Sequence, residues 1–179
     1  MEHAPIVCAL AEWFARHKRE MPWRCTRDPY CIWISEVMLQ QTQVATVIPY
    51  FERWMARFPN FATLAAAEEH EVLAHWQGLG YYARARNLHR AAKHVAGIHD
   101  GALPDDMDAI TALPGVGPYT AGAIAAFAFD RPVAAIDGNI ARVLSRLTDL
   151  RVPIDTASGQ HELRALAAHL LPARGGRLH

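Results

Sequence analysis

The stretch Leu113–Asn139, LPGVGPYTAGAIAAFAFDRPVAAIDGN, decides the fold because it contains a glycine turn, a helix start and, near its end, a carboxylate. Gly115 and Gly117 lack a Cβ and can take positive φ, so the backbone N–H groups of this turn can approach another molecule closely. Pro118 suits the first position of a helix, and the N-terminus of a helix favours an anion such as a phosphate. The pattern predicts a helix at 105–112, a hairpin turn and a second helix that begins at Pro118.

The carboxylate is Asp137, which follows the apolar residues 133–136 and opens a predicted helix at 140–147. An aspartate at this place in a sequence is most often a helix N-cap. The hairpin, taken alone, fits an ordinary corner between two helices equally well. The choice between a structural and a functional interpretation therefore depends on the rest of the chain.

Composition limits the kinds of protein that this chain can be. Its 179 residues are 51% hydrophobic and carry no net charge, which suits a core in one domain or two small lobes. Zero net charge counts mildly against DNA binding, which would have to use local patches and backbone dipoles. Cys8, Cys25 and Cys31 are too few for a disulfide framework and suit a reducing cytosol. Without a long apolar run or a signal peptide, we expect a cytoplasmic protein that does not span a membrane.

A helix is predicted from Asp28-Pro29, an N-cap followed by proline at the first helical position. This helix places Glu36 on the same face as Trp33 and Val37. A glutamate with apolar neighbours either extends to water or is desolvated. Desolvation raises its pKa from about 4.3 and would make it a proton donor near neutral pH. The residues alone leave both alternatives open.

Residues 35–44, SEVMLQQTQV, closely match the signature of MutY-type adenine DNA glycosylases. Residues 113–118 resemble the helix-hairpin-helix motif of the wider DNA glycosylase superfamily. The resemblance extends over roughly residues 10–172. It implies an all-α, two-lobed helix-hairpin-helix fold with the active site in the cleft between the lobes.

The same resemblance implies how the chain divides. Residues 28–130 would form a six-helix barrel lobe that includes the helix-hairpin-helix at 105–129. Residues 1–27 and 131–179 would form a second helical lobe, incomplete and without the cluster-binding loop. Relatives continue into four cysteines that hold a 4Fe-4S cluster and into a domain that checks 8-oxoguanine. Because those cysteines are absent from this chain, we assign it neither a metal nor a cofactor.

The resemblance further implies roles for individual residues. Glu36 would be the general acid that protonates adenine N7, and Asp137 would stabilise or transiently trap the cationic sugar before water adds. Asn139 would orient Asp137 or the water, and Tyr119 belongs to the same catalytic set. The implied adenine pocket consists of Arg19, Met21, Trp23, Arg24, Leu39 and Val44. The implied DNA-contacting residues are Gln40, Gln41, Thr42, Tyr81, Gly115, Val116, Gly117, Tyr119 and Thr120.

The most basic stretch follows the turn at 78–80. A predicted helix at 83–96 carries four cations, Arg84, Arg86, Arg90 and Lys93. Such a helix is usually a solvated charged face. Tyr81 beside basic residues also suits an aromatic wedge in a base step with cations on the phosphates, and the resemblance selects Tyr81 as that wedge.

The implied activity is excision of adenine opposite 8-oxoguanine or guanine from double-stranded DNA by a monomeric enzyme that extrudes the base. Two alternatives remain. In the endonuclease III branch, a lysine at the position of Tyr119 forms a Schiff base and cleaves the strand, which a phenol cannot do. A catalytically inactive DNA-binding fragment is the other alternative, because the family's C-terminal segments are missing.

Overall fold

The computed structural model describes residues 4–171, and this part of the chain contains helices and no strand. The all-α expectation is therefore confirmed for these residues. None of the described helices is long and apolar enough to cross a bilayer. In chain order the elements are α1 (Ala4–His17), the 3-10 helix η1 (Pro22–Arg24), α2 (Pro29–Leu39), α3 (Val44–Arg57), α4 (Phe61–Ala66), α5 (Glu69–Trp76), α6 (Ala83–Ile98), α7 (Met107–Thr111), α8 (Pro118–Phe127), α9 (Gly138–Leu147) and α10 (Ala157–Leu170).

Local sequence signals start many of these helices. Pro29 and Pro118 stand at first helical positions, where the missing N–H has no cost. Side-chain oxygens that accept hydrogen bonds from first-turn N–H groups cap several helices; the capping residues are Asp28, Asn60, Asp106, Asp137 and Thr156. The helix predicted at 105–112 is shorter than expected, because Asp106 caps it and it begins at Met107.

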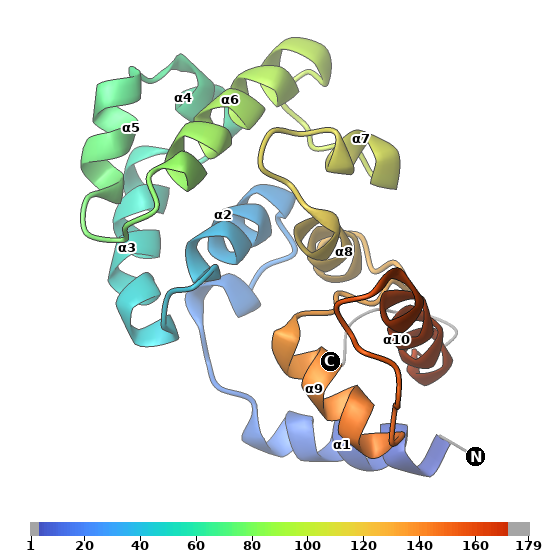
Figure 1. Cartoon of the computed structure of the whole chain (residues 1–179). Coiled ribbons are helices and arrows are strands. Elements are labelled where there is room, and N and C mark those ends of the chain that lie inside the picture. Colours follow the sequence, from blue (N-terminus) through green and yellow to red (C-terminus); the bar gives the residue numbers. More distant parts are fainter. Residues whose placement is uncertain (1–3, 172–179) are drawn as a thin grey trace.

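Helices α2 and α8 pack against each other in the middle of the molecule (Figure 1). In α8 every residue from Thr120 to Ala126 is buried, and in α2 the residues from Ile32 to Met38 are buried. Helices that are apolar all round are enclosed by protein on all sides. The two signature stretches of the sequence therefore form the central pair of helices.

Aromatic side chains fill the core around α2 to α6. The Tyr30 hydroxyl donates to the Phe58 carbonyl at 2.7 Å and accepts the Trp54 indole N–H at 3.2 Å. Buried tyrosines and tryptophans need such partners for their polar atoms. The rings of Phe61 and Trp76 pack against Tyr30 and Trp54 respectively, so one aromatic cluster joins four helices.

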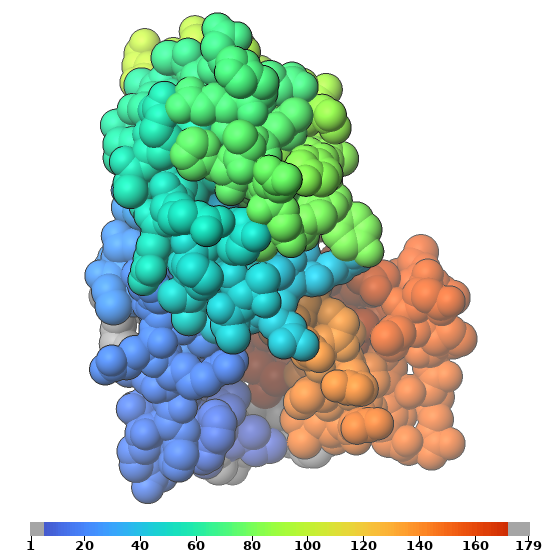
Figure 2. Space-filling view, turned by 90° about the vertical axis from the view of Figure 1, so that its left-hand side faces the viewer, coloured from blue at the N-terminus to red at the C-terminus, as the bar shows by residue number. Residues whose placement is uncertain are grey.

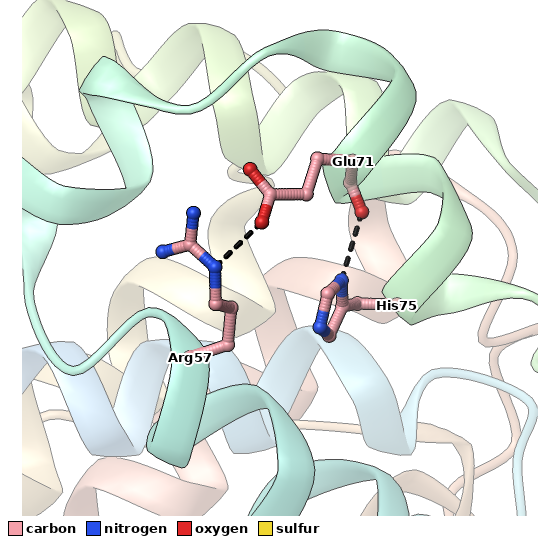
Figure 3. A network of polar contacts seen from close by, with 3 residues as sticks. All are labelled: Arg57, Glu71 and His75. Atoms are coloured by element: carbon pink, nitrogen blue, oxygen red, sulfur yellow. Dashed lines mark hydrogen bonds and ion pairs between the residues drawn. The ribbon is translucent and has the colours of Figure 1, made fainter.

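A polar network ties α3 to α5 at the surface of this lobe (Figure 3). Arg57 Nε donates to Glu71 Oε1 at 2.5 Å, and His75 Nδ1 lies 2.9 Å from the Glu71 carbonyl oxygen. Both partners of the ion pair are partly exposed, so its contribution to stability is small, about 0–1 kcal/mol.

A second, smaller hydrophobic cluster joins α9 to α10 (Figure 1). Its buried members are Ala141, Leu144, Leu163 and Ala167. Two separate clusters agree with two lobes, although Met21 and Trp23, which we placed in the second lobe, pack into the larger cluster. The lobe boundaries stay a prediction, and residues 1–3 and 172–179 of the second lobe lie outside the described part of the chain.

Candidate active site

A cavity of about 900 Å³ opens between the segment around η1, α2 and the first turns of α8 and α9. Figure 2 shows the molecular surface hollowed between the blue N-terminal segment and the orange segment that contains α9. This volume is large enough for a purine nucleoside. All six residues predicted for the adenine pocket line this cavity: Arg19, Met21, Trp23, Arg24, Leu39 and Val44.

Glu36 lines the same cavity from the middle of α2 and is only 8% exposed. Of the two alternatives left open by the sequence, the structure has the desolvated one. Burial raises the pKa of Glu36, and the nearby negative charge of Asp137 raises it further. A hydrogen bond from Tyr119 and the charge of Arg24 act in the opposite direction. The net shift of the pKa is upward, toward the range in which a carboxylic acid can deliver a proton.

Tyr119 stands in the first turn of α8 and lines the cavity beside Glu36. Its hydroxyl donates to Glu36 Oε2 at 3.1 Å. Burial, followed by the charge of Glu36, raises the pKa of Tyr119, so this phenol remains a neutral donor. The bond links α2 to the helix that follows the hairpin, and it fixes the orientation of the Glu36 carboxyl group.

Asp137 is the N-cap of α9. Its Oδ1 accepts the Ile140 N–H at 2.8 Å, and its Oδ2 accepts the Asn139 side-chain amide at 3.2 Å. Ile140 lines the cavity, and the charge of Asp137 acts on both Glu36 and Tyr119. Asp137 therefore caps α9 next to a residue that lines the cavity, and the orienting role of Asn139 stays a prediction that this hydrogen bond supports.

The two glycines of the hairpin differ in backbone conformation. Gly115 has φ of 77°, and a Cβ there would lie 2.6 Å from Asn87. Gly117, however, is extended, with φ of −89° and ψ of 175°, a conformation open to any residue. Gly117 therefore does not use the positive φ that glycine allows, because that residue is the N-cap of α8, where an extended backbone is the rule.

Two of the predicted DNA-contacting residues have buried side chains. Val116 packs into the larger cluster, and its N–H donates to the Leu113 carbonyl at 3.1 Å. The Thr120 hydroxyl accepts the Gln40 side-chain amide at 3.3 Å. The side chains of Val116 and Thr120 therefore stabilise the hairpin from inside, whereas Gly115 and Gly117 are exposed.

Three of the four cations of the basic helix α6 face solvent: Arg86, Arg90 and Lys93. Arg84 is buried, so its assignment to a phosphate-contacting face is wrong. Arg86 pairs with Glu69 at 3.2 Å, and Arg90 donates to Asn87 at 2.5 Å. Spacing along a helix cannot separate buried from exposed arginines, because the carbonyl groups that compensate the buried one come from distant segments.

Several cavity residues were missed by sequence reasoning. Ile32 lies one helical turn before Glu36, so helical spacing could have found it. Phe14 and Phe127 have no local signal, because only the tertiary fold brings α1 and the end of α8 to the cavity. The other missed residues are Lys18, Glu20, Cys25, Ser35 and Ile140.

The cysteines do not fit an iron-sulfur cluster. Cys8, Cys25 and Cys31 are free thiols, and Cys31 Sγ lies 3.5 Å from an Asp28 oxygen. A 4Fe-4S cluster held by thiolates needs four ligands, and the described residues contain no cluster of three or more metal-ligating side chains. The three cysteines therefore cannot hold such a cluster by themselves.

Residues 34–166 match the family described as "HhH-GPD superfamily base excision DNA repair protein". Among curated relatives, an adenine DNA glycosylase of Mus musculus is 44% identical over 93% of this chain. An adenine DNA glycosylase of Mycolicibacterium smegmatis is 39% identical over 91% of it. The chain spans about a third (34%) of the length of the mouse protein and 55% of the mycobacterial one.

Solved structures show the same fold. A thermostable thymine-DNA glycosylase superposes with a TM-score of 0.85 at 28% identity, covering 95% of this chain and 78% of its own. A trapped covalent intermediate of endonuclease III with DNA superposes with a TM-score of 0.78 at 24% identity, covering 96% and 79%. The two-lobed helical architecture expected from the sequence is therefore the fold of a known group of proteins.

Proposed function

Because the chain belongs to the HhH-GPD superfamily of base excision DNA repair proteins, we propose that it is a monofunctional DNA glycosylase. Its substrate is adenine opposite 8-oxoguanine or guanine in double-stranded DNA, and the enzyme acts as a monomer. The observation that carries the proposal is the desolvated Glu36, hydrogen-bonded to Tyr119 on a cavity large enough for a purine nucleoside. The curated relatives named adenine DNA glycosylases support the choice of base.

Glu36 is the proton donor in this proposal. Adenine is a poor leaving group until its ring is protonated, and a carboxylic acid whose pKa is raised by burial holds a proton closer to neutral pH. The proton goes to N7, the glycosidic bond breaks toward the base, and Glu36 is left as a carboxylate. The Tyr119 hydroxyl then donates to that carboxylate and stabilises it.

Asp137 stabilises the sugar in this proposal. As the glycosidic bond breaks, the deoxyribose gains oxocarbenium character, and a fixed carboxylate stabilises it. Hydrogen bonds from Ile140 and Asn139 hold the two Asp137 oxygens in place before the reaction begins. Water then adds to the sugar and loses a proton to the Glu36 carboxylate, which restores the acid and completes hydrolysis of the N-glycosidic bond.

The test is base release from a panel of duplexes, followed by alkaline cleavage at the abasic site. The panel contains adenine opposite 8-oxoguanine, adenine opposite guanine, thymine opposite guanine, and thymine glycol. Release of adenine that is strongly slowed in Glu36→Gln and unchanged in Glu52→Gln, an exposed glutamate on α3, is the expected result. Release of thymine alone, or adenine release at the wild-type rate in Glu36→Gln, contradicts the proposal.

The same panel separates hydrolysis from lyase chemistry. Lys18 is the lysine among the cavity-lining residues, so it is the amine that could form a Schiff base there. Borohydride added during the reaction would trap such an adduct. We expect strand cleavage only after alkali and no adduct that depends on Lys18, whereas an adduct removed by Lys18→Gln would support a glycosylase-lyase.

A further inference from the structure

Arg84 extends from the start of α6 into the protein, where it is 9% exposed, and contacts the end of α2. One terminal nitrogen donates to the carbonyl groups of Val37, Met38 and Gln40 at 3.0, 3.1 and 2.6 Å. The other nitrogen lies 3.4 Å from the Thr42 hydroxyl. Arg84 therefore caps the carbonyl end of α2 and fixes the loop that follows it.

The same guanidinium also holds the loop between α5 and α6. Its second nitrogen donates to the carbonyl groups of Leu79 and Gly80 at 2.9 and 3.3 Å. The guanidinium carbon lies 5.1 Å from the centre of the Trp76 ring and 5.7 Å from that of Tyr81. One side chain thus joins two loops that are about forty residues apart in the sequence. Its partners at the end of α2 precede Arg84 by 42 to 47 positions.

Each of these loops presents one exposed side chain on a strained backbone. Gln41 has φ of 57°, and Tyr81 has φ of 47° and is 67% exposed. A residue other than glycine keeps positive φ only where its surroundings hold it there. Arg84 bonds directly to residues on both sides of Gln41 and to the residues that precede Tyr81, so it supplies that restraint.

The acceptors around Arg84 suit the planar fork of arginine, whose two terminal nitrogens point to different groups of oxygens. The partners of its guanidinium are backbone carbonyls, one hydroxyl and two ring faces, and they belong to two separate regions of the chain, the end of α2 with its loop and the segment from the end of α5 to Tyr81. Lysine has one ammonium at the end of its stem and cannot reach both groups of acceptors in fixed directions. Conversion of Arg84 to lysine therefore keeps a cation and loses the bridge.

We propose that Arg84 is a positioning residue that holds Gln41 and Tyr81 as one rigid pair, so that both enter the duplex together when the target base is extruded. This inference rests on the proposed glycosylase function and adds to it a determinant of base extrusion. Arg84 acts through the two loops and touches no reacting atom.

The test compares Arg84→Lys with the wild-type chain and with Arg57→Lys, a partly exposed arginine of α3 paired with Glu71. Single-turnover release of adenine reports the reaction, and the fluorescence of 2-aminopurine in place of the target adenine reports unstacking. We expect Arg84→Lys to slow unstacking and release on the order of 10²-fold, because a small misplacement has that effect. Arg57→Lys should stay within about a factor of two, as an exposed pair contributes little.

A mutant cycle separates positioning from a merely structural effect. In a chain that already carries Gln41→Ala and Tyr81→Ala, the added Arg84→Lys should have little further effect on release, because residues that act as a unit are not additive. Equal slowing by Arg84→Lys in both backgrounds overturns the inference, as does unchanged unstacking in the single variant. Absence of base release from the wild-type chain would instead contradict the proposed function.

Hydrogen exchange of the wild-type chain provides a measurement that does not depend on whether Arg84→Lys folds. The Thr42 N–H bonds to the Leu39 carbonyl, and the Leu79 N–H bonds to that of Trp76. If Arg84 makes both loops rigid, these two amides exchange as slowly as amides inside α2. Exchange at the rate of an unstructured peptide overturns the inference.

Discussion

Glu36 and Asp137 lie close enough for the charge of Asp137 to raise the pKa of Glu36, but they belong to regions built in different ways. Glu36 lies in the middle of a helix that is buried nearly all round, inside the larger hydrophobic cluster. Asp137 lies at the start of α9, next to the smaller cluster, and is held by hydrogen bonds from Asn139 and Ile140. Burial thus raises the pKa of Glu36, whereas hydrogen bonds at the start of α9 hold the Asp137 carboxylate in one orientation.

The regions also differ in how completely their apolar surfaces are covered. In the larger cluster, side chains such as Trp33 and Leu64 are almost fully buried. On α9 the apolar Val143 and Leu147 remain exposed, as does Trp13 on α1. The closely packed region therefore holds the proposed proton donor, and the less covered region holds the carboxylate that we propose stabilises the sugar.

The largest effect is expected from a change at the fixed charge. Asp137→Ser keeps an oxygen that can cap α9, so the melting temperature should change little, but it removes the carboxylate. Adenine release should slow by on the order of 10²–10³-fold, the loss typical of one electrostatic stabiliser. Asp106→Ser, the same change at the N-cap of α7, is the control and should leave release unaltered. Release by Asp137→Ser at the wild-type rate would contradict the assigned role.

The contrast between the two clusters predicts unequal costs for the same truncation. Leu64→Ala in the larger cluster should lower the free energy of unfolding by about 3–5 kcal/mol, because the closely packed surroundings cannot collapse. Leu144→Ala in the smaller cluster should cost about 2 kcal/mol or less, since that site borders solvent. Urea denaturation of both variants measures the difference. Equal costs would show that the two regions are equally well packed.

The two hairpin glycines provide a matched pair. Gly115→Ala places a Cβ against Asn87 at positive φ, so it should destabilise the chain by more than about 1 kcal/mol. Gly117→Ala meets no atom within 4 Å at an ordinary φ and should change stability by less than about 0.5 kcal/mol. Thermal melting measures both, and a larger loss for Gly117→Ala would disprove the geometry described for the turn.

The smallest effect is on stability and depends on pH. The pKa of Glu36 is higher in the folded chain than in the unfolded one, so its contribution to stability is complete below the unfolded pKa and is lost as pH rises through the folded pKa. Glu36→Gln removes that loss. We therefore expect the variant to melt at a higher temperature than the wild type at pH 7.5 and to show no such gain at pH 4. A gain that is the same at both values would contradict desolvation of Glu36.

Features set by neighbouring residues could be predicted from the sequence, whereas features set by distant residues could not. Asp137 as a helix cap, the helix beginning at Pro118 and the hairpin could be predicted, because each depends on neighbouring residues. The desolvation of Glu36 stayed one of two alternatives, because it depends on side chains such as Tyr119, which is 83 positions away. The burial of Arg84 was not predicted for the same reason, since its acceptors lie on α2 and on the preceding loop.

The pH dependence of single-turnover adenine release tests the central claim most directly. If Glu36 delivers the proton, the rate falls about tenfold per pH unit above a midpoint that lies higher than the usual glutamate value of about 4.3. This falling limb is absent in Glu36→Gln, whose residual rate does not depend on pH over the same range. A wild-type profile whose falling limb persists in Glu36→Gln, or lies at the ordinary glutamate value, would contradict the account.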